Sequence, residues 1–327
     1  MKVTFWGTRG SLPAAYRSED IRRKLARALE AAQGKDLSNS QAIDRFIREE
    51  LPVDVAHVVG CNTSCVEIES RAGTRILCDA GSGLRDFIHR LPAATAQAPG
   101  DYHFFMSHPH WDHIQGFPFF GPAYRAGNRI IIHSCHPGIE PALRAQADGR
   151  SFPIPYDQLK AEIIFDIQPV DHVWQIGDIT VRAIEQNHPG KSYGYRFEAD
   201  GQAVVYSTDS EHHASVMSQE SPFFAFFSEA DLLIFDAMYT LADATVAKAN
   251  WGHSSNVLGV DMASRAKVKT LALFHHEPTN TDEALAGFLQ ATRTYAQIHF
   301  EESGCVKDSD RFPHRIILAT DGLVWEG

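Results

Sequence analysis

The sequence contains a dense group of metal-binding side chains in the segment YHFFMSHPHWDHIQG, residues 102–116. His108, His110, Asp112 and His113 form the pattern H-x-H-x-D-H, so four candidate ligands lie within six positions. Neutral imidazoles and carboxylates are ligands that zinc and related divalent metals accept in proteins. Histidine accounts for only 17 of the 327 residues, so this clustering is improbable by chance. The pattern therefore predicts a metal site.

Further candidate ligands share one feature, because each stands where an apolar, strand-like segment stops. Residues at strand ends along one edge of a sheet are held rigidly and can meet although they are distant in sequence. We therefore expect them to form one site. Asp79 follows RILC, the H-x-H-x-D-H group follows HFFM, His188 follows ITVRAIEQN, Asp209 follows AVVYST, Asp236 follows LLIF and His275 follows TLALF.

The choice between His275 and the adjacent His276 depends on strand geometry. Successive side chains of a strand point to opposite faces, so only one of the two can point inward. His275 is the first residue past the strand and is the expected ligand.

The remaining sequence predicts the elements that position these residues. Two strand-rich halves with helices between strands predict an α/β (α+β) fold of two sheets sandwiched by helices, as a single domain over residues 1–327. The closing segment ILATDGLVWE carries the Asp-Gly signal of a tight hairpin, whereas residues 141–160 match no pattern. Strands are expected at 2–7, 65–69, 74–78, 102–106, 129–134, 162–167, 180–186, 193–198, 203–207, 232–235 and 270–274, and helices at 83–90, 255–266 and 282–298.

A helical insertion is predicted near the N-terminus, at about residues 18–51. Its first helix places Ile21, Leu25 and Leu29 on one face. A second helix over residues 40–51 repeats apolar residues at helical spacing and stops before a proline. We expect the apolar faces to be packed, either as a lid over the site or as the face of a homodimer.

Composition argues against several classes of partner. Acidic residues outnumber basic ones 41 to 30, and no basic block exceeds Arg22-Arg23-Lys24, so a large nucleic acid is disfavoured and a small-molecule substrate is expected. No run of 18 apolar residues and no apolar leader segment is present, so we expect no membrane partner and a cytoplasmic location. The five cysteines are scattered without C-x-x-C pairing, which predicts reduced thiols.

The H-x-H-x-D-H group, with later strand-end ligands and an earlier aspartate, resembles the motif set of the metallo-β-lactamase superfamily over nearly the whole chain. The resemblance implies a four-layer αββα sandwich that binds two divalent metal ions, usually zinc and sometimes manganese or iron. An aspartate at the bridging position is similar to the hydrolase and phosphodiesterase branches. By this resemblance His108, His110 and His188 hold the first metal, Asp112, His113 and His275 hold the second, Asp209 bridges them, and Asp79 supports the ligands from outside.

Two further segments resemble the phosphodiesterase and tRNase Z branch. Phe235-Asp236-Ala237-Met238-Tyr239 is similar to its acidic H-E-A-T motif, and Gly252-His253-Ser254-Ser255 is similar to its G-H-S motif. In that branch the acid orients a histidine that contacts the scissile phosphate or protonates the leaving group, which implies these roles for Asp236 and His253. Aspartate is shorter than the glutamate of the motif. A helix N-cap at Ser254 or Ser255 is the alternative interpretation of the second segment.

The turn Gly60-Cys61-Asn62-Thr63-Ser64-Cys65 resembles a glycine-asparagine turn that faces the site in the same branch. Asn62 or Ser64 would then donate to a substrate oxygen, and a plain turn is the alternative. His212 and His213 are expected at a solvated helix start. Structural roles are expected for His103, His133 and His136.

The leading expectation is a dinuclear metal-dependent phosphodiesterase that uses metal-bound hydroxide on a small phosphodiester, such as a cyclic nucleotide. Two metals lower the pKa of bound water to about 7 and hold both reacting oxygens, and Asp112 would also orient the nucleophile. An acyl hydrolase (lactonase or thioesterase) shares all metal ligands. A non-catalytic di-iron sensor on the same fold is the alternative from another class. A tRNA-processing enzyme is disfavoured because no Gly/Pro-rich basic arm is evident.

Overall fold

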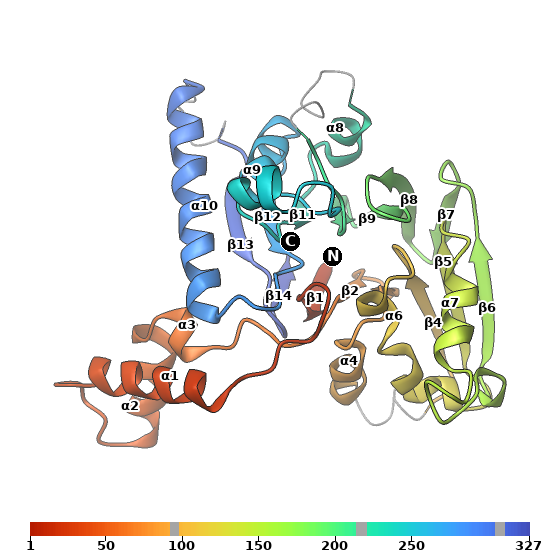
Figure 1. Cartoon of the computed structure of the whole chain (residues 1–327), viewed down its shortest axis with the longest axis horizontal. Helices are drawn as coiled ribbons and strands as arrows, with labels where there is room; N and C mark the ends of the chain where they lie inside the picture. The colour runs from red at the N-terminus through yellow and green to blue at the C-terminus, as the bar shows by residue number, and fades with distance from the viewer. Residues whose placement is uncertain (92–97, 214–220, 305–310) are drawn as a thin grey trace.

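The strands form two seven-stranded sheets that lie face to face in the computed structural model, which describes residues 1–91, 98–213, 221–304 and 311–327 (Figure 1). The first sheet contains, in spatial order, β14 (Val324–Glu326), β1 (Lys2–Gly7), β2 (Cys65–Glu69), β3 (Arg75–Cys78), β4 (Asp101–Phe105), β5 (Arg129–Ser134) and β6 (Glu162–Ile167). The second contains β13 (Arg315–Leu318), β12 (Thr270–Phe274), β11 (Leu232–Asp236), β10 (Gln202–Ser207), β9 (Ser192–Ala199), β8 (Ile179–Gln186) and β7 (Val173–Ile176).

Helices cover the outer face of each sheet, so most strands are buried on both faces. This explains why strands such as β11 are continuous apolar runs rather than alternating patterns. Phe5 and Ile68 of the first sheet belong to the same core cluster as Tyr195 and Tyr206 of the second. The predicted αββα sandwich is confirmed. The first sheet packs against α4 (Leu84–Arg90), α6 (Trp111–Ile114) and α7 (Ile139–Gln146), and the second against α8 (Pro222–Phe227), α9 (Asn256–Arg265) and α10 (Asp282–Glu302).

Parallel pairing brings the carboxyl ends of the central strands to one edge of the sandwich. In the first sheet β3, β4, β5 and β6 run parallel, and in the second β10, β11, β12 and β13 do so. Loops that follow these strands therefore share one edge. Short helical turns complete the described elements: η2 (Phe117–Phe119), η3 (Gly121–Tyr124), η4 (Tyr156–Gln158) and the π-helix η6 (Asp243–Ala247).

The hairpin predicted for the closing segment is wrong. Strand β13 pairs in parallel with β12 of the second sheet, whereas β14 pairs antiparallel with β1 of the first. The connecting residue Asp321 accepts hydrogen bonds from the backbone N–H groups of Cys61 and Asn62 and from the Thr8 hydroxyl (2.9, 2.9 and 3.1 Å). These tertiary partners let the Asp-Gly turn join two sheets instead of two paired strands.

Sequence patterns also missed β7, α7 and α8, which are short elements. The four described cysteines, Cys61, Cys65, Cys78 and Cys135, are free thiols, and Cys305 lies outside the described residues. Within the described part of the chain, no helix is both long and apolar enough to cross a membrane.

The helical insertion consists of α1 (Ser18–Ala31), α2 (Ser40–Arg45), the π-helix η1 (Phe46–Glu50) and α3 (Val53–Ala56). It projects beyond the sandwich next to α10 (Figure 1). Of the two alternatives expected for the insertion, a lid that packs the apolar face of α1 against this chain does not match the structure, because Ile21, Leu25 and Leu29 are all exposed. Charged side chains of α1 contact α3 of the same insertion and α10 of the sandwich.

Candidate metal centre

The candidate ligands gather at the strand-end edge of the sandwich, where the backbone turns sharply. Asp79, Asp209 and His275 each follow a strand closely and have positive φ angles of 58°, 51° and 61°. Non-glycine residues rarely adopt this conformation, which costs about 1–3 kcal/mol each and persists only where the surroundings impose it. The fold therefore turns these three side chains into the site at a local energetic cost.

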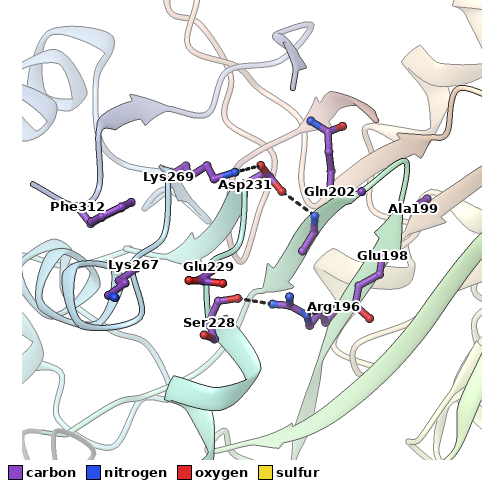
Figure 2. A pocket seen from close by; sticks show the side chains of 12 residues that line it. Arg196, Glu198, Ala199, Gln202, Ser228, Glu229, Asp231, Lys267, Lys269 and Phe312 are labelled. Atoms are coloured by element: carbon purple, nitrogen blue, oxygen red, sulfur yellow. Dashed lines mark hydrogen bonds and ion pairs between the residues drawn. The ribbon is translucent and has the colours of Figure 1, made fainter. Parts of the chain in front are cut away.

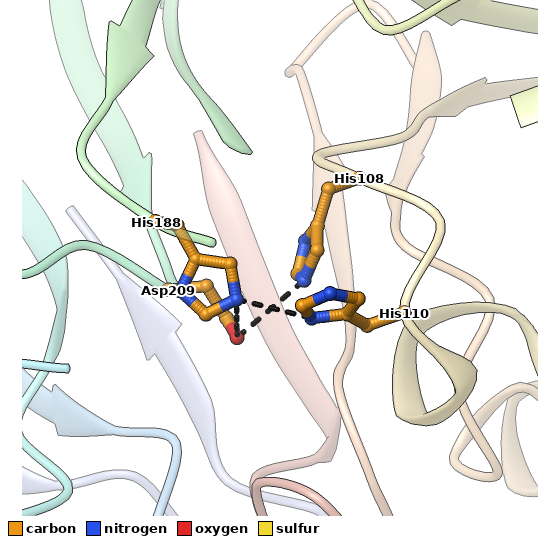
Figure 3. A group of neighbouring side chains, drawn as sticks. All are labelled: His108, His110, His188 and Asp209. Atoms are coloured by element: carbon orange, nitrogen blue, oxygen red, sulfur yellow. Dashed lines mark hydrogen bonds and ion pairs between the residues drawn. The ribbon is translucent and has the colours of Figure 1, made fainter. Parts of the chain in front are cut away.

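One group of ligand atoms comes from His108, His110, His188 and Asp209 (Figure 3). His188 Nε2 lies 3.0 Å from His110 Nδ1. Asp209 Oδ2 lies 3.6 Å from His108 Nε2 and 3.7 Å from His188 Nε2. Because Zn–N bonds are about 2.0–2.1 Å long, tetrahedral ligand atoms lie somewhat more than 3 Å apart. The group therefore has the spacing of ligands around one ion.

A second group comprises Asp112, His113 and His275. Asp112 Oδ2 lies 3.2 Å from His113 Nε2 and 3.8 Å from His275 Nε2. Asp209 faces this group as well, with Oδ1 3.1 Å from His113 Nε2 and Oδ2 3.3 Å from His275 Nε2. Asp209 thus lies between the two groups, in the position of a bridging carboxylate.

Hydrogen bonds at the far side of each ring fix which nitrogen faces the cluster. His113 Nδ1 donates to Asp79 Oδ2 (2.7 Å), and His188 Nδ1 donates to the Gly252 carbonyl (2.9 Å). Such second partners orient metal-ligating imidazoles and set their tautomers. Asp79 therefore lies behind the His113 ring, on the side away from the cluster.

Orphaned nitrogen atoms provide a test of whether these residues fit a metal. The Nε2 atoms of His108, His113 and His275 are buried and have no hydrogen-bond partner. Buried polar atoms without partners are rare and costly in folded proteins. Three of them, aimed at two carboxylates, fit the donor set of a divalent cation pair.

The charges of the candidate ligand side chains also suit divalent metal cations. Burial lowers the pKa of His108 and of His275, so both imidazoles are neutral and keep a lone pair for a metal. Burial opposes ionisation of Asp112, but the imidazolium form of His113, whose own pKa the neighbouring carboxylates raise against burial, lowers the pKa of Asp112 to about 2. The same balance, with the charged form of His113 as the main neighbour, holds the pKa of Asp209 well below its ordinary value. Two buried carboxylates are therefore charged at neutral pH.

His253 and Asp236 form a pair at the border of the cluster. His253 Nδ1 donates to Asp236 Oδ2 (2.8 Å), so the shorter aspartate does reach the histidine. Burial disfavours the imidazolium, but the Asp236 carboxylate raises the pKa of His253 to about 9. His253 also lies within ligand distance of Asp209 and His275. A protonated histidine is thereby held beside the second ligand group.

The backbone around His253 is held by Glu211, a residue that sequence patterns did not single out. Its carboxylate accepts from the N–H groups of Asn250 and Gly252 (2.8 and 2.9 Å). The Gly252 carbonyl is the group that orients His188. Glu211 thus supports a first-group ligand and the candidate acid through one loop. In the sequence, only the position of Glu211 two residues after Asp209 points to a role at the site.

The roles expected for Asn62 and Ser64 toward a substrate do not match their positions. The Asn62 amide donates to Asp86 Oδ2 (2.9 Å) and holds the turn against α4. Ser64 is fully buried, and its hydroxyl lies 3.2 Å from His275 Nδ1, behind the ring. Both residues therefore build the site from outside, because the turn packs under the ligand loops.

Three other histidine expectations can be compared with the structure. His275 faces the cluster, whereas His276 Nε2 donates to the Ala319 carbonyl (2.8 Å) on the other side. His212 is buried rather than solvated, stacked on Phe235 with ring centroids 5.5 Å apart, and residues 214–220 after it lie outside the described residues. His133 is buried, and its Nδ1 donates to Asp166 Oδ2 (2.7 Å).

Two exposed indole rings stand next to the candidate ligands. Trp111 directly follows His110 and is 64% exposed, and Trp251 precedes His253 by two residues and is 60% exposed. Large aromatic side chains are seldom left this open without a partner. Two exposed aromatic rings thus lie within two residues of His110 and His253 in the chain.

A separate hollow of about 730 Å³ opens at the opposite strand ends of the second sheet (Figure 2). Four of its charged side chains form ion pairs within the hollow: Lys269 pairs with Asp231 at 2.7 Å, and Arg196 pairs with Glu198 at 2.9 Å. It shares no residue with the ligand groups. The chemistry therefore centres on the strand-end cluster, not on this hollow.

Comparisons with known proteins agree with this geometry. The family model for the Beta-lactamase superfamily domain matches residues 74–276, more than half of the chain. A ribonuclease Z from Haloarcula marismortui is 25% identical over 263 residues, covering 65% of this chain and 80% of that protein.

Two solved structures share the fold along their whole length. The metallo-beta-lactamase fold protein YhfI from Bacillus subtilis has a TM-score of 0.62 and 20% identity, with 100% of this chain and 99% of that chain covered. The short form of human tRNase Z has a TM-score of 0.59 and 16% identity, with 100% and 99% covered.

Proposed function

This chain is a metal-dependent hydrolase of the beta-lactamase superfamily, in the branch that resembles ribonuclease Z, and we propose that it hydrolyses a small phosphodiester at a two-metal site. The proposed ligands of the first ion are His108, His110 and His188, those of the second are Asp112, His113 and His275, and Asp209 bridges. Zinc suits this donor set, and manganese or iron are the alternatives. When bound, such ions polarise a phosphoryl oxygen and lower the pKa of a water molecule.

The observation that carries the proposal is the His253–Asp236 pair beside the ligand groups. Hydrolysis of a phosphodiester expels an alkoxide, which needs a proton. With a pKa of about 9, His253 is protonated at neutral pH and Asp236 orients it through Nδ1. Its Nε2–H is then free to contact a phosphate oxygen or to protonate the leaving oxygen.

Other residues of this chain would complete the site. Asp112 accepts a hydrogen bond from the Ser11 backbone N–H (2.8 Å), which holds its carboxylate in one orientation. We assign it a role in positioning the attacking water. Trp111 and Trp251 offer exposed rings on which a nucleobase can stack, and this supports a nucleotide as the substrate.

Cleavage of bis(p-nitrophenyl) phosphate by the purified protein with zinc or manganese tests the proposal. We expect turnover that His110→Ala abolishes, while His89→Ala, an exposed histidine on α4, leaves it unchanged. The same samples are assayed with ester and lactone substrates and for metal content. Ester or lactone hydrolysis without phosphodiester cleavage at full metal occupancy would identify an acyl hydrolase instead. Iron with an oxygen-dependent visible spectrum and no turnover would identify a sensor.

RNA processing is the second candidate function, because the sequence relatives are ribonuclease Z proteins. They count against the expectation that large nucleic acids are not substrates. The net charge of −11 favours a small substrate. Binding and 3′ cleavage of precursor tRNA at low salt would establish RNA processing, and cleavage of nucleotides alone would exclude it.

A further inference from the structure

Tyr239 follows Asp236, the last residue of β11, by three positions and lies beside the loop that carries His253. Its backbone N–H donates to the Ser254 carbonyl (3.2 Å), and its carbonyl accepts from the Asn256 N–H (3.3 Å). The two bonds tie the chain after β11 to the residues that follow His253. The backbone of Tyr239 is therefore fixed next to the candidate acid.

The Tyr239 ring is held by two neighbouring side chains. Lys248 Nζ lies 4.4 Å from the centroid of the Tyr239 ring, and Glu277 holds this ammonium group at 2.6 Å. The His253 ring meets the Tyr239 ring at an angle of 90°, with centroids 5.6 Å apart. A cation over the ring face and an edge-to-face aromatic contact are both favourable. The position of the hydroxyl at the end of the ring is therefore fixed as well.

The Tyr239 hydroxyl has no hydrogen-bond partner among the described residues, although the side chain is only 4% exposed. Buried tyrosines of this chain can be compared with it. The Tyr195 hydroxyl donates to the Met106 carbonyl, and the Tyr206 hydroxyl donates to Asp79 Oδ2, both at 2.8 Å. Buried tyrosine hydroxyls usually have such partners. The hydroxyl of Tyr239 is therefore available to a bound molecule.

The charges around the Tyr239 hydroxyl include the proposed metal site. Burial raises the pKa of Tyr239, and the carboxylates of Glu277, Asp236 and Asp209 raise it further. Asp209 is the proposed bridging ligand, so the hydroxyl lies within electrostatic reach of the centre of the site. The phenol stays protonated at neutral pH and can donate a hydrogen bond. A neutral donor thus lies beside the protonated His253.

We propose that the Tyr239 hydroxyl is a catalytic group that donates a hydrogen bond to a non-bridging oxygen of the substrate phosphate. This inference rests on the proposed phosphodiesterase function. The non-bridging oxygens carry the charge of a phosphodiester, whereas the leaving oxygen needs a proton. Tyr239 serves the first need and His253 the second, because a phenol with a raised pKa is a poor source of protons. Since the ring is held in advance, the donor needs no reorganisation during the reaction.

Tyr239→Phe removes the hydroxyl and keeps the ring that contacts His253 and Lys248. We expect kcat/KM for bis(p-nitrophenyl) phosphate to fall by about 10- to 100-fold, with metal content and thermal unfolding unchanged. Tyr156→Phe is the matched control, because the Tyr156 hydroxyl also lacks a partner but is enclosed in the core outside the first sheet. It should leave turnover unchanged. Wild-type kcat/KM in Tyr239→Phe would overturn the proposal and leave the phosphodiesterase function standing.

A series of aryl methyl phosphates with increasingly basic leaving groups locates the oxygen that Tyr239 contacts. Tyr239→Phe should lose the same factor throughout, because the non-bridging oxygens are common to the series. Asp236→Asn, which disables the proposed acid, should lose more as the leaving group becomes more basic. A loss in Tyr239→Phe that grows in the same way would overturn the assignment to a non-bridging oxygen.

Calorimetric titration of the zinc-loaded protein with inorganic phosphate tests the contact without turnover. Tyr239→Phe should raise the phosphate Kd at least about tenfold, the effect of losing one hydrogen bond to a charged group, and Tyr156→Phe should not. Equal phosphate affinity in wild type and Tyr239→Phe would overturn the proposal. Weaker binding by Tyr239→Phe, in a protein whose wild type cleaves no phosphodiester, would support the contact and reject only the proposed reaction.

Discussion

At the scale of single residues, the His253–Asp236 pair combines two opposing effects in one contact. Burial favours the neutral imidazole, and the carboxylate at 2.8 Å outweighs it. The pKa of about 9 is therefore a property of the pair and not of the histidine alone. Removing the charge of Asp236 while keeping its shape separates the two effects.

Asp236→Asn should lower kcat for a phosphodiester by about 10²-fold, the usual contribution of a general acid. Without the Asp236 carboxylate, burial opposes the imidazolium and only the Asp209 and Asp112 carboxylates still favour it. The pKa of His253 should therefore fall, and the alkaline limb of the pH–rate profile should move to lower pH. Metal content should not change, since Asp236 is not a proposed ligand. Asp157→Asn, on a 93% exposed side chain, is the control. An unchanged profile would remove His253 from the proposed acid role.

Glu211→Ala should weaken metal binding or lower activity by about 10–100-fold, as is typical when an outer partner of a ligand is lost. The variant frees the N–H groups of Asn250 and Gly252 and so releases the loop that orients His188. Glu211→Gln keeps one carbonyl acceptor and should restore part of the loss. Zinc titration together with kcat and KM checks this. Equal behaviour of the Ala and Gln variants would argue against positioning through these hydrogen bonds.

At the scale of elements, close approach between loops decides where ligands point. Gly252 has a φ of +90°, and a Cβ at this position would lie 2.2 Å from His188 Nδ1. A side chain here would collide with a proposed first-group ligand. The loop before α9 and the loop after β8 are therefore packed too tightly for any residue but glycine.

Gly252→Ala should lose the metal of the first ligand group while the sandwich stays folded. Gly201→Ala is the matched control, because its φ of +71° imposes similar backbone strain but nothing lies within 4 Å of the added Cβ. The difference between the two variants isolates the collision with His188. Metal stoichiometry and thermal unfolding provide the measurement, and equal metal content in both variants would contradict the prediction.

At the scale of the whole molecule, buried neutral histidines couple folding to pH. Burial lowers the pKa of His133 to about 4, and that of His212 and His276 to about 3. The unfolded chain therefore binds more protons than the folded chain below the ordinary histidine pKa of about 6.5, so stability falls as pH falls.

His133→Gln should flatten the decline of the unfolding free energy between about pH 6.5 and 4. The pKa of about 4 for His133 corresponds to a contribution of about 3 kcal/mol over this range. Urea unfolding at several pH values, with wild type and variant both stripped of metal by a chelator, compares the slopes. Parallel slopes for the two proteins would show that His133 does not carry this dependence.

Much of the fold was predictable because local patterns agree with the final packing. Apolar strands such as β11 and β12 are buried on both faces and were placed within one or two residues. The hairpin predicted for ILATDGLVWE does not form, because the hydrogen-bond partners of Asp321 lie on a turn that is distant in sequence. The stripe of α1 was recognised, but its orientation was not, because the ion pairs with Asp54 and Asp282 are tertiary contacts.

The sequence by itself determined the chemistry of the site, because side-chain types and strand-end positions are local properties: the H-x-H-x-D-H group, the later strand-end ligands and the family resemblance need no coordinates. Only the tertiary structure decided how these groups act together. It paired His253 with Asp236, placed Ser64 behind His275 and Asn62 against Asp86, and brought Glu211 to the Gly252 backbone. These outcomes depend on distances between segments far apart in the chain, and such distances are set by packing of the two sheets rather than by any local pattern.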